Sequence, residues 1–176
     1  GACATAAVSL GSAWDLLQVG KADFVVAGGF DDLSVEGNLG FSSMQATAAT
    51  DDMLARGIGP RSMSRPNDIR RDGFVESHGG ATLLLTTVER AVEMGLPIYG
   101  CLALADSHND GLQTSIPAPG KGLLALGMRL KGRPAPLEKA LDDWGLSVND
   151  IRVLSKHDTS TAANDPTEAA LLCELM

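Results

Sequence analysis

The sequence is poor in aromatic side chains and in positive charge. Only 4% of its 176 residues are Phe, Trp or Tyr, so a core must be built mainly from Ala, Leu, Val and Ile, within the 44% of residues that are hydrophobic. Fourteen Lys and Arg against 22 Asp and Glu give a formal net charge of −8. This balance argues against a protein that binds nucleic acid or a membrane surface, because both need a basic face. A small, acidic or acylated partner stays compatible with it.

Cysteine is also scarce, and the three residues Cys3, Cys101 and Cys173 lie far apart. An odd number at such spacing forms neither a disulfide framework nor a Cys-x-x-Cys metal pair, so we expect a reducing, cytoplasmic setting. No signal peptide and no apolar run of bilayer length is visible. The chain begins without Met and inside what reads as a motif, so we expect residues 1–176 to be a fragment of one domain of a longer polypeptide.

Hydrophobic periodicity predicts alternating strands and helices, and therefore an α/β fold with helices on both faces of a sheet. The expected strands are 22–27 (buried on both faces), 81–86, 98–105 and 150–160, the last of which ends in polar residues. The expected helices are a first helix with an apolar face from Ala6 to Leu17 and a stop at Gly20, a helix that ends at Gly95, a helix at 136–146, and a last helix with Asn164 or Asp165 as N-cap and Pro166 at its first position. Residues 31–72 are expected to form a long excursion with short helices.

Cys3 stands between the small residues Gly1, Ala2 and Ala4, where the first helix should begin. Unpaired N–H groups and the positive end of the helix dipole favour a thiolate there. A tight strand-to-helix turn that exposes a nucleophile leaves little room for neighbouring side chains, as in serine elbows. The competing interpretation is a small buried hydrophobe, which is what most free cysteines are.

His157 is expected at the end of a strand, where α/β folds bind ligands. A dense run of hydrogen-bonding residues follows it, which suits either a flexible polar ligand or the cap of the next helix: Thr159, Ser160, Thr161, Asn164 and Asp165. A lone histidine is more often structural than catalytic. His78 and His108 have no partner at metal-ligand spacing, so no metal site is expected.

Five segments, in this order, resemble the β-ketoacyl synthase domain of type I fatty acid synthases, with actinobacterial single-chain enzymes nearest and fungal ones next. They are "GACATA", "VVAGGFDD", "SRPNDIRRDGFVESHGG", "TSIPAPGKG" and "SKHDTSTAANDPTE". The resemblance covers nearly the whole chain. It implies a thiolase-like fold, layered αβαβα from two related halves, of which this chain carries the central portion.

The resemblance also implies roles for single residues. Cys3 matches the nucleophile that accepts the acyl chain, and His157 matches the first of two active-site histidines, which assists decarboxylation of the malonyl extender. Thr159 and Thr161 match threonines that contact phosphopantetheine, and Phe74 matches a residue that lines the acyl and pantetheine channel. Glu168 matches a buried acid that helps hold the site together through a lysine.

The implied reaction is a decarboxylative Claisen condensation that extends fatty acids by two carbons. No metal or redox cofactor is expected in this domain, since phosphopantetheine arrives on the acyl carrier protein. That carrier, other fatty acid synthase domains and a second copy of the domain are the implied partners. An enolate formed on loss of CO2 needs a hydrogen-bond donor, which a histidine supplies.

Two departures from the family pattern stand out. The second histidine, the active-site lysine and a Gly-Phe-Gly segment lie beyond the last residue, so we expect the isolated fragment to be inactive. Asp158 stands where many bacterial stand-alone synthases carry Gly. Three alternatives remain open: a thiolase, a polyketide synthase condensing domain, and a non-catalytic scaffold of the same fold.

Overall fold

The computed structural model describes residues 2–107, 134 and 136–175. The chain divides into two compact units, the first from Gly1–Asp32 and His78–Ser107 and the second from Leu33–Ser77 and His108–Met176. His108 and the "TSIPAPGKG" segment, both singled out in the sequence, lie outside the described residues. No helix in the described ranges is both long enough and apolar enough to cross a membrane.

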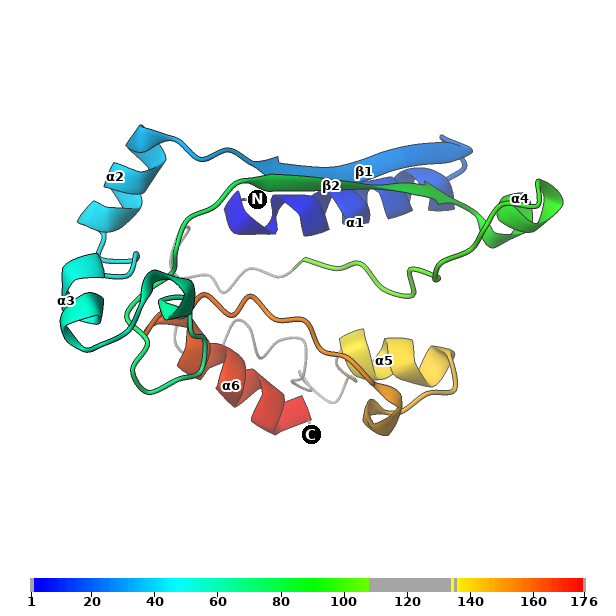
Figure 1. Ribbon diagram of the computed structural model, residues 1–176. Helices are drawn as coiled ribbons and strands as arrows, with labels where there is room; N and C mark the ends of the chain where they lie inside the picture. Colours follow the sequence, from blue (N-terminus) through cyan, green and yellow to red (C-terminus); the bar gives the residue numbers. More distant parts are fainter. Residues whose placement is uncertain (1, 108–133, 135, 176) are drawn as a thin grey trace. The chain divides into compact units, whose positions relative to one another are not determined.

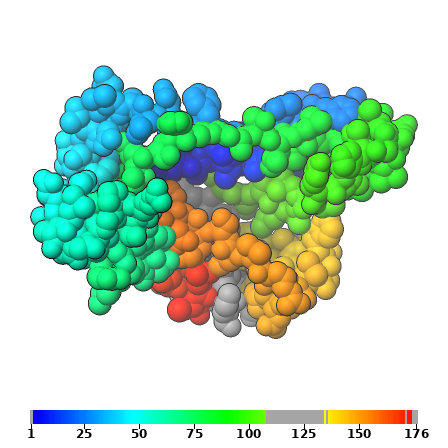
Figure 2. All heavy atoms as spheres, viewed as in Figure 1, coloured from blue at the N-terminus to red at the C-terminus, as the bar shows by residue number. Residues whose placement is uncertain are grey.

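The first unit is a helix packed on a two-stranded antiparallel sheet. A 3-10 turn (Ala2–Ala4) leads into α1 (Thr5–Gln18), which lies along one face of the ribbon formed by β1 (Phe24–Asp31) and β2 (Gly79–Thr86) (Figure 1). The short α4 (Val88–Glu93) follows β2. The space-filling view shows the dark blue atoms of α1 against the strands (Figure 2).

The predicted end of the first helix is confirmed. Gly20 has a φ of 66° and donates its N–H to the Leu17 carbonyl, while Lys21 donates to the Leu16 carbonyl. These two bonds form a Schellman motif, in which glycine supplies the left-handed residue at no steric cost. Gly95 ends α4 in the same way, also as predicted.

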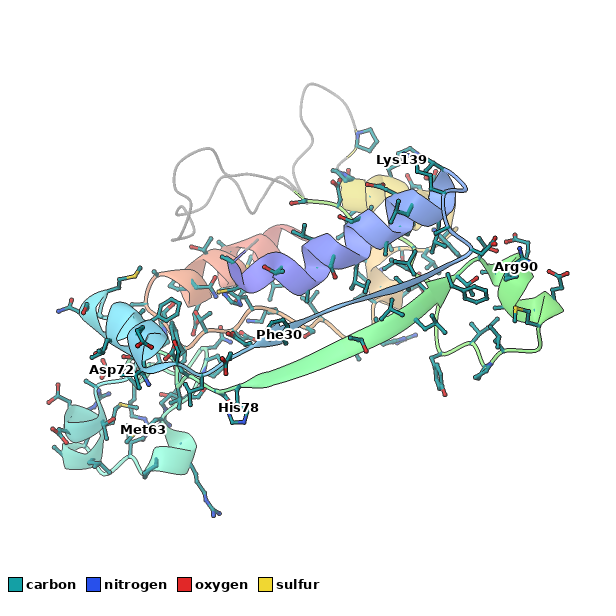
Figure 3. The ribbon with its side chains drawn as sticks, turned by 90° about the horizontal axis from the view of Figure 1, so that it is seen from above. Phe30, Met63, Asp72, His78, Arg90 and Lys139 are labelled. Atoms are coloured by element: carbon teal, nitrogen blue, oxygen red, sulfur yellow. The ribbon has the colours of Figure 1, made fainter. Side chains whose placement is uncertain are left out.

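The predicted strand at 22–27 exists, but the prediction that it is buried on both faces is wrong. Within β1 only Ala27 is buried, and Phe30, labelled in Figure 3, is 87% exposed. The register pairs Val26 with Leu84, so these side chains share the face opposite α1, and both are exposed. One helix covers one face of this sheet in the described part of the chain, which leaves the other face open.

The predicted strands at 98–105 and 150–160 are also wrong. The described residues in both ranges form no ladder, and the only sheet in the described part of the chain is the pair β1–β2. A strand requires a hydrogen-bonded neighbour as well as apolar residues of suitable shape. These segments have the composition of strands without such a neighbour among the described residues.

The second unit is helical and irregular. Its elements are α2 (Val35–Ser43), α3 (Thr50–Ala55), the 3-10 turns Pro60–Ser62 and Val148–Asp150, α5 (Pro136–Asp143) and α6 (Asn164–Leu175). A small core of Met53, Ile58 and Met63 packs with Ala48 beside α3; Met63 is labelled in Figure 3. The short helices predicted between residues 31 and 72 are thereby confirmed.

Candidate functional site

Cys3 lies in the turn that starts α1, as its position in the sequence predicts. The turn Ala2–Ala4 runs directly into the helix, and the Cys3 side chain is exposed. Ala2 takes a φ of 43°, a left-handed conformation that is rare for a non-glycine residue. Its carbonyl accepts a hydrogen bond of 2.7 Å from the Thr5 hydroxyl, which holds this tight turn closed.

Small residues bring α1 close to β1 in the first unit. A Cβ atom added at Gly29 would lie 2.9 Å from the Cβ of Ala6, so the helix and strand approach through glycine and alanine. One turn further along α1, the Ser9 hydroxyl donates to the Gly28 carbonyl at 2.7 Å and accepts from the Gly28 N–H at 2.9 Å. These contacts fix α1, the helix that follows Cys3, against β1.

His157 belongs to the second unit, in a loop that α6 holds through Glu168. The buried Glu168 carboxylate accepts the backbone N–H of His157 at 2.6 Å and that of Asp158 at 2.7 Å. It also accepts from the side-chain amide of Asn164, one turn earlier in α6, at 2.8 Å. The buried acid that the resemblance implies is therefore present, and it acts directly on the main chain of the loop. Its link to a lysine stays a prediction.

The start of α6 differs from the prediction. Neither Asn164 nor Asp165 is the N-cap, since the helix begins at Asn164 and the Thr161 hydroxyl accepts the Asn164 N–H at 3.1 Å, three residues on. This is the geometry of a threonine cap. Pro166 lies in the first turn and not at its first position. Asn164 and Asp165 are both buried; the Asn164 amide donates to Glu168 within α6, whereas Asp165 binds another segment through Asn67.

The two threonines of the predicted site contact each other. The hydroxyls of Thr159 and Thr161 lie 2.8 Å apart, and both residues are partly buried. Between them Ser160 is fully buried, with a φ of 63°. Its hydroxyl accepts the Arg65 N–H at 3.1 Å and its carbonyl accepts the Gly73 N–H at 2.9 Å. Ser160 thus ties the threonine loop to the segment that carries Phe74.

Phe74 is fixed by pairing with a neighbouring extended segment. Its N–H donates to the Ala46 carbonyl, its carbonyl accepts from Ala48, and its ring packs edge-on against Phe41 with centroids 5.2 Å apart. Gly73 makes this approach possible, because a Cβ there would lie 2.5 Å from the Thr47 carbonyl carbon. Phe74, Thr159, Thr161, His157 and Glu168 are therefore joined by one network within the second unit.

A second buried acid braces the same loop. Asp165, 2% exposed, accepts the Asn67 N–H at 2.8 Å and lies 3.5 Å from the Arg71 guanidinium. Arg71 also donates to the Thr161 carbonyl at 3.1 Å. The other Asp165 carboxylate oxygen, Oδ1, is buried and has no hydrogen-bond partner among the residues that the structure describes.

Charged groups flank His157 on either side in the sequence. Lys156 Nζ lies 2.5 Å from Asp158 Oδ1, which also accepts a 2.9 Å hydrogen bond from Asn67 Nδ2. The hydrogen bond from Lys156 lowers the pKa of Asp158, with a smaller contribution from Asn67, and Asp158 in turn raises the pKa of Lys156. At Asp68, hydrogen bonds from Arg70 and then Arg65 hold the carboxyl pKa far below its usual range.

Sequence reasoning found five of the residues in this network and missed their long-range supports. Lys156, Asn67, Arg71 and the burial of Ser160 were not anticipated, although the first three stand inside the quoted motifs. Asp158 was noticed only as a departure from glycine. Cys3 belongs to the first unit, whereas His157 belongs to the second.

Comparison with known proteins identifies the family to which this chain belongs. The family model "Beta-ketoacyl synthase, N-terminal domain" matches residues 1–91, and "Beta-ketoacyl synthase, C-terminal domain" matches residues 99–176. The fatty acid synthase alpha subunit stcJ of Emericella nidulans is 45% identical over 98% of this chain. Fatty acid synthase 2 of Mycosarcoma maydis is 41% identical over 96% of it. The chain spans only 11% and 4% of these two relatives.

Two solved structures share the fold. A β-ketoacyl synthase from Burkholderia phymatum has a TM-score of 0.72 at 27% identity, with 98% of this chain and 38% of that chain covered. A ketosynthase complex with a type II polyketide acyl-carrier protein has a TM-score of 0.77 at 27% identity, with 97% and 38% covered. The thiolase-like fold expected from the motifs is confirmed for the portion that this chain represents, and the chain belongs to the β-ketoacyl synthase family.

Proposed function

We propose that this chain forms part of the 3-oxoacyl-[acyl-carrier-protein] synthase domain of a fatty acid synthase. The single observation that carries the proposal is the exposed Cys3 in the turn that starts α1, at the position where the family resemblance expects an acyl acceptor. The fatty acid synthases from two fungi that match over nearly the whole chain support fatty acids as the product class.

In the first half-reaction the Cys3 sulfur attacks the carbonyl of an acyl thioester on the carrier protein. The C–S bond to the phosphopantetheine arm breaks, that thiol leaves with a proton, and an acyl–Cys3 thioester remains. The helix start assists by placing unpaired N–H groups and the positive dipole end near the sulfur. The exposed position of Cys3 allows a carrier-borne thioester to reach it.

In the second half-reaction a malonyl thioester loses CO2, and the electron pair of the broken C–C bond forms an enolate. The His157 imidazole would donate a hydrogen bond to the enolate oxygen, where negative charge develops. The enolate carbon then attacks the acyl–Cys3 carbonyl, and the Cys3 thiolate leaves. The product is a 3-oxoacyl thioester two carbons longer.

The remaining residues would bind the arm and keep the loop in place. Thr159 and Thr161 are partly buried, with hydroxyls 2.8 Å apart, which suits the polar groups of a pantetheine chain. Phe74 would contact its apolar part, and Glu168 would orient the His157 main chain. The domain itself would need no metal or redox group, since phosphopantetheine is delivered by the carrier.

The proposed partners are an acyl carrier protein, the other domains of a fatty acid synthase, and a second copy of the domain, all in the cytoplasm. A structural neighbour is described as a ketosynthase in complex with an acyl-carrier protein. Because that neighbour belongs to a polyketide system, a polyketide product is the second candidate, and it differs only in the chain that is extended.

Alkylation of the full-length protein with iodoacetamide, followed by mapping of the adduct, tests the nucleophile. We expect Cys3 to react before Cys101 and Cys173, which are also exposed, and an acyl-carrier substrate to protect it. Labelling of only the other two would contradict the proposal. Release of CO2 from a malonyl thioester separates a synthase from a thiolase, which condenses without decarboxylation.

A further inference from the structure

Asp158, the residue directly after His157, has a backbone conformation that disfavours its own residue type. Its φ is 45°, in the left-handed region where glycine is unstrained and L-residues are uncommon. Aspartate tolerates this region better than most residues but still less well than glycine. Glycine at this position, as in many stand-alone synthases, would satisfy the turn without strain, so the aspartate side chain needs an explanation.

The Asp158 side chain bridges two segments. Its Oδ1 lies 2.5 Å from Lys156 Nζ and 2.9 Å from Asn67 Nδ2. The side chains of Lys156 and Asp158 are only 17% and 32% exposed, so this ion pair is partly shielded from water. Asn67 is itself fixed, since its N–H donates to the buried Asp165 carboxylate. We call these three residues the Lys156–Asp158–Asn67 clasp.

The clasp joins the side chains of the two residues that flank His157 in the sequence, while Glu168 holds His157 itself through the main chain. Lys156 and Asp158 are neighbours of His157 in the sequence, so joining them restricts the backbone torsions of the residue between them. Glu168 accepts the N–H groups of both His157 and Asp158. The side chain of Asn67, 91 residues before Asp158, then connects residues 156–158 to a segment that is distant in the sequence.

We propose that Asp158 is a positioning residue for His157, acting through the Lys156–Asp158–Asn67 clasp to hold the imidazole where the enolate oxygen forms. The inference rests on the proposed function, since it names a support for the residue assigned to decarboxylation. In this role the side-chain bonds offset the cost of a left-handed aspartate, and the gain is a fixed orientation of the preceding histidine.

Three substitutions in the full-length protein separate this role from a purely conformational one. Asp158→Gly keeps the left-handed turn and removes the clasp. Asp158→Asn tolerates the turn and keeps an oxygen for Asn67 but loses the ion pair with Lys156. Asp158→Ala loses both the turn preference and the clasp. If only φ matters, Gly performs at least as well as Asp; if the clasp matters, Asn outperforms Gly.

We expect kcat for malonyl-thioester decarboxylation to fall about tenfold in Asp158→Gly, because a small misplacement of a catalytic group costs rate more than binding. KM should change less than about twofold, and Asp158→Asn should lie between Gly and wild type. The Tm of Asp158→Gly should not fall below that of Asp158→Ala. Wild-type kcat in Asp158→Gly would overturn the proposal.

Asn67→Gly offers an independent test from the other side of the clasp. Glycine accepts the φ of 61° at this position and keeps the N–H that donates to Asp165, so only the side-chain amide is lost. We expect a fall in kcat of the same order as for Asp158→Gly, and no further fall in the double variant, because both remove one interaction. Additive losses would contradict the clasp.

A matched control is Asp143→Asn, which breaks the Lys139–Asp143 pair of the same 2.5 Å length on the exposed surface of α5 and should leave kcat unchanged. If the wild type itself releases no CO2, the proposed function fails. The clasp is then judged by hydrogen exchange alone: the His157 and Asp158 amides should exchange faster in Asp158→Gly than in wild type, and equal exchange would refute it.

Discussion

Glu168→Gln is the substitution that most directly tests how α6 holds the histidine loop. The carboxylate accepts at both oxygens: the His157 N–H at Oε1, and the Asp158 N–H and Asn164 amide at Oε2. Glutamine has the same shape but only one acceptor oxygen. If the glutamine oxygen takes the place of Oε2, it keeps the bonds from Asp158 and Asn164. The glutamine NH2 group then faces the His157 N–H, and two donors cannot form a hydrogen bond.

The cost follows from these contacts. A hydrogen bond to a charged acceptor contributes about 1.5–3 kcal/mol, and a neutral one roughly half of that. Losing the His157 bond and weakening two others at a site only 8% exposed should reduce the stability of the loop by about 3 kcal/mol. Since every 1.4 kcal/mol is a factor of ten, this corresponds to about 100-fold faster opening of the loop.

Hydrogen exchange followed by mass spectrometry measures this opening at the site itself. The peptide that contains His157 and Asp158 should lose its protection in Glu168→Gln, while peptides from β1 and β2 keep theirs. Glu36→Gln, at an exposed position in the first turn of α2, is the matched control and should change nothing near residue 157. Exchange within about twofold of wild type in Glu168→Gln would refute the reasoning.

Three further outcomes are expected. Gly73→Ala should destabilise the protein by about 3 kcal/mol or more, seen as a lower urea midpoint, because the added Cβ meets Thr47 backbone at 2.5 Å and φ is 119°. Ser9→Ala should cost about 1–3 kcal/mol by the same measurement, since the N–H and carbonyl of Gly28 both lose their partner; equal midpoints would contradict it. Folding lowers the pKa of Asp158. The ionised Asp158 therefore contributes its full stabilisation above the unfolded pKa of about 3.9, and this stabilisation is lost as the pH falls through the folded pKa. Asp158→Asn should remove this loss, so that the free energy of unfolding depends less on pH in the acid range.

The sequence predicts those parts of the fold that depend on near neighbours. The first helix and its end follow from apolar spacing and from Gly20, because a helix satisfies its hydrogen bonds within itself. The segments 98–105 and 150–160 have the composition of strands but form none among the described residues, since pairing depends on a partner that composition does not reveal. The prediction that β1 is buried on both faces failed for the same reason, because the burial of a sheet face depends on which other elements pack against it.

The two residues proposed to catalyse the reaction show the same difference between structure set by near neighbours in the sequence and structure set by distant contacts. Each is flanked by a non-glycine residue in a left-handed conformation: Ala2, at 43°, precedes Cys3, and Asp158, at 45°, follows His157. At Ala2 the turn is closed by Thr5, three residues away, so the sequence alone could place the nucleophile at a helix start. At Asp158 one closing contact comes from Asn67, 91 residues away, which no local pattern records. The cysteine turn is therefore encoded locally, whereas the histidine turn depends on folding of the whole second unit and should lose its geometry first when that unit is destabilised.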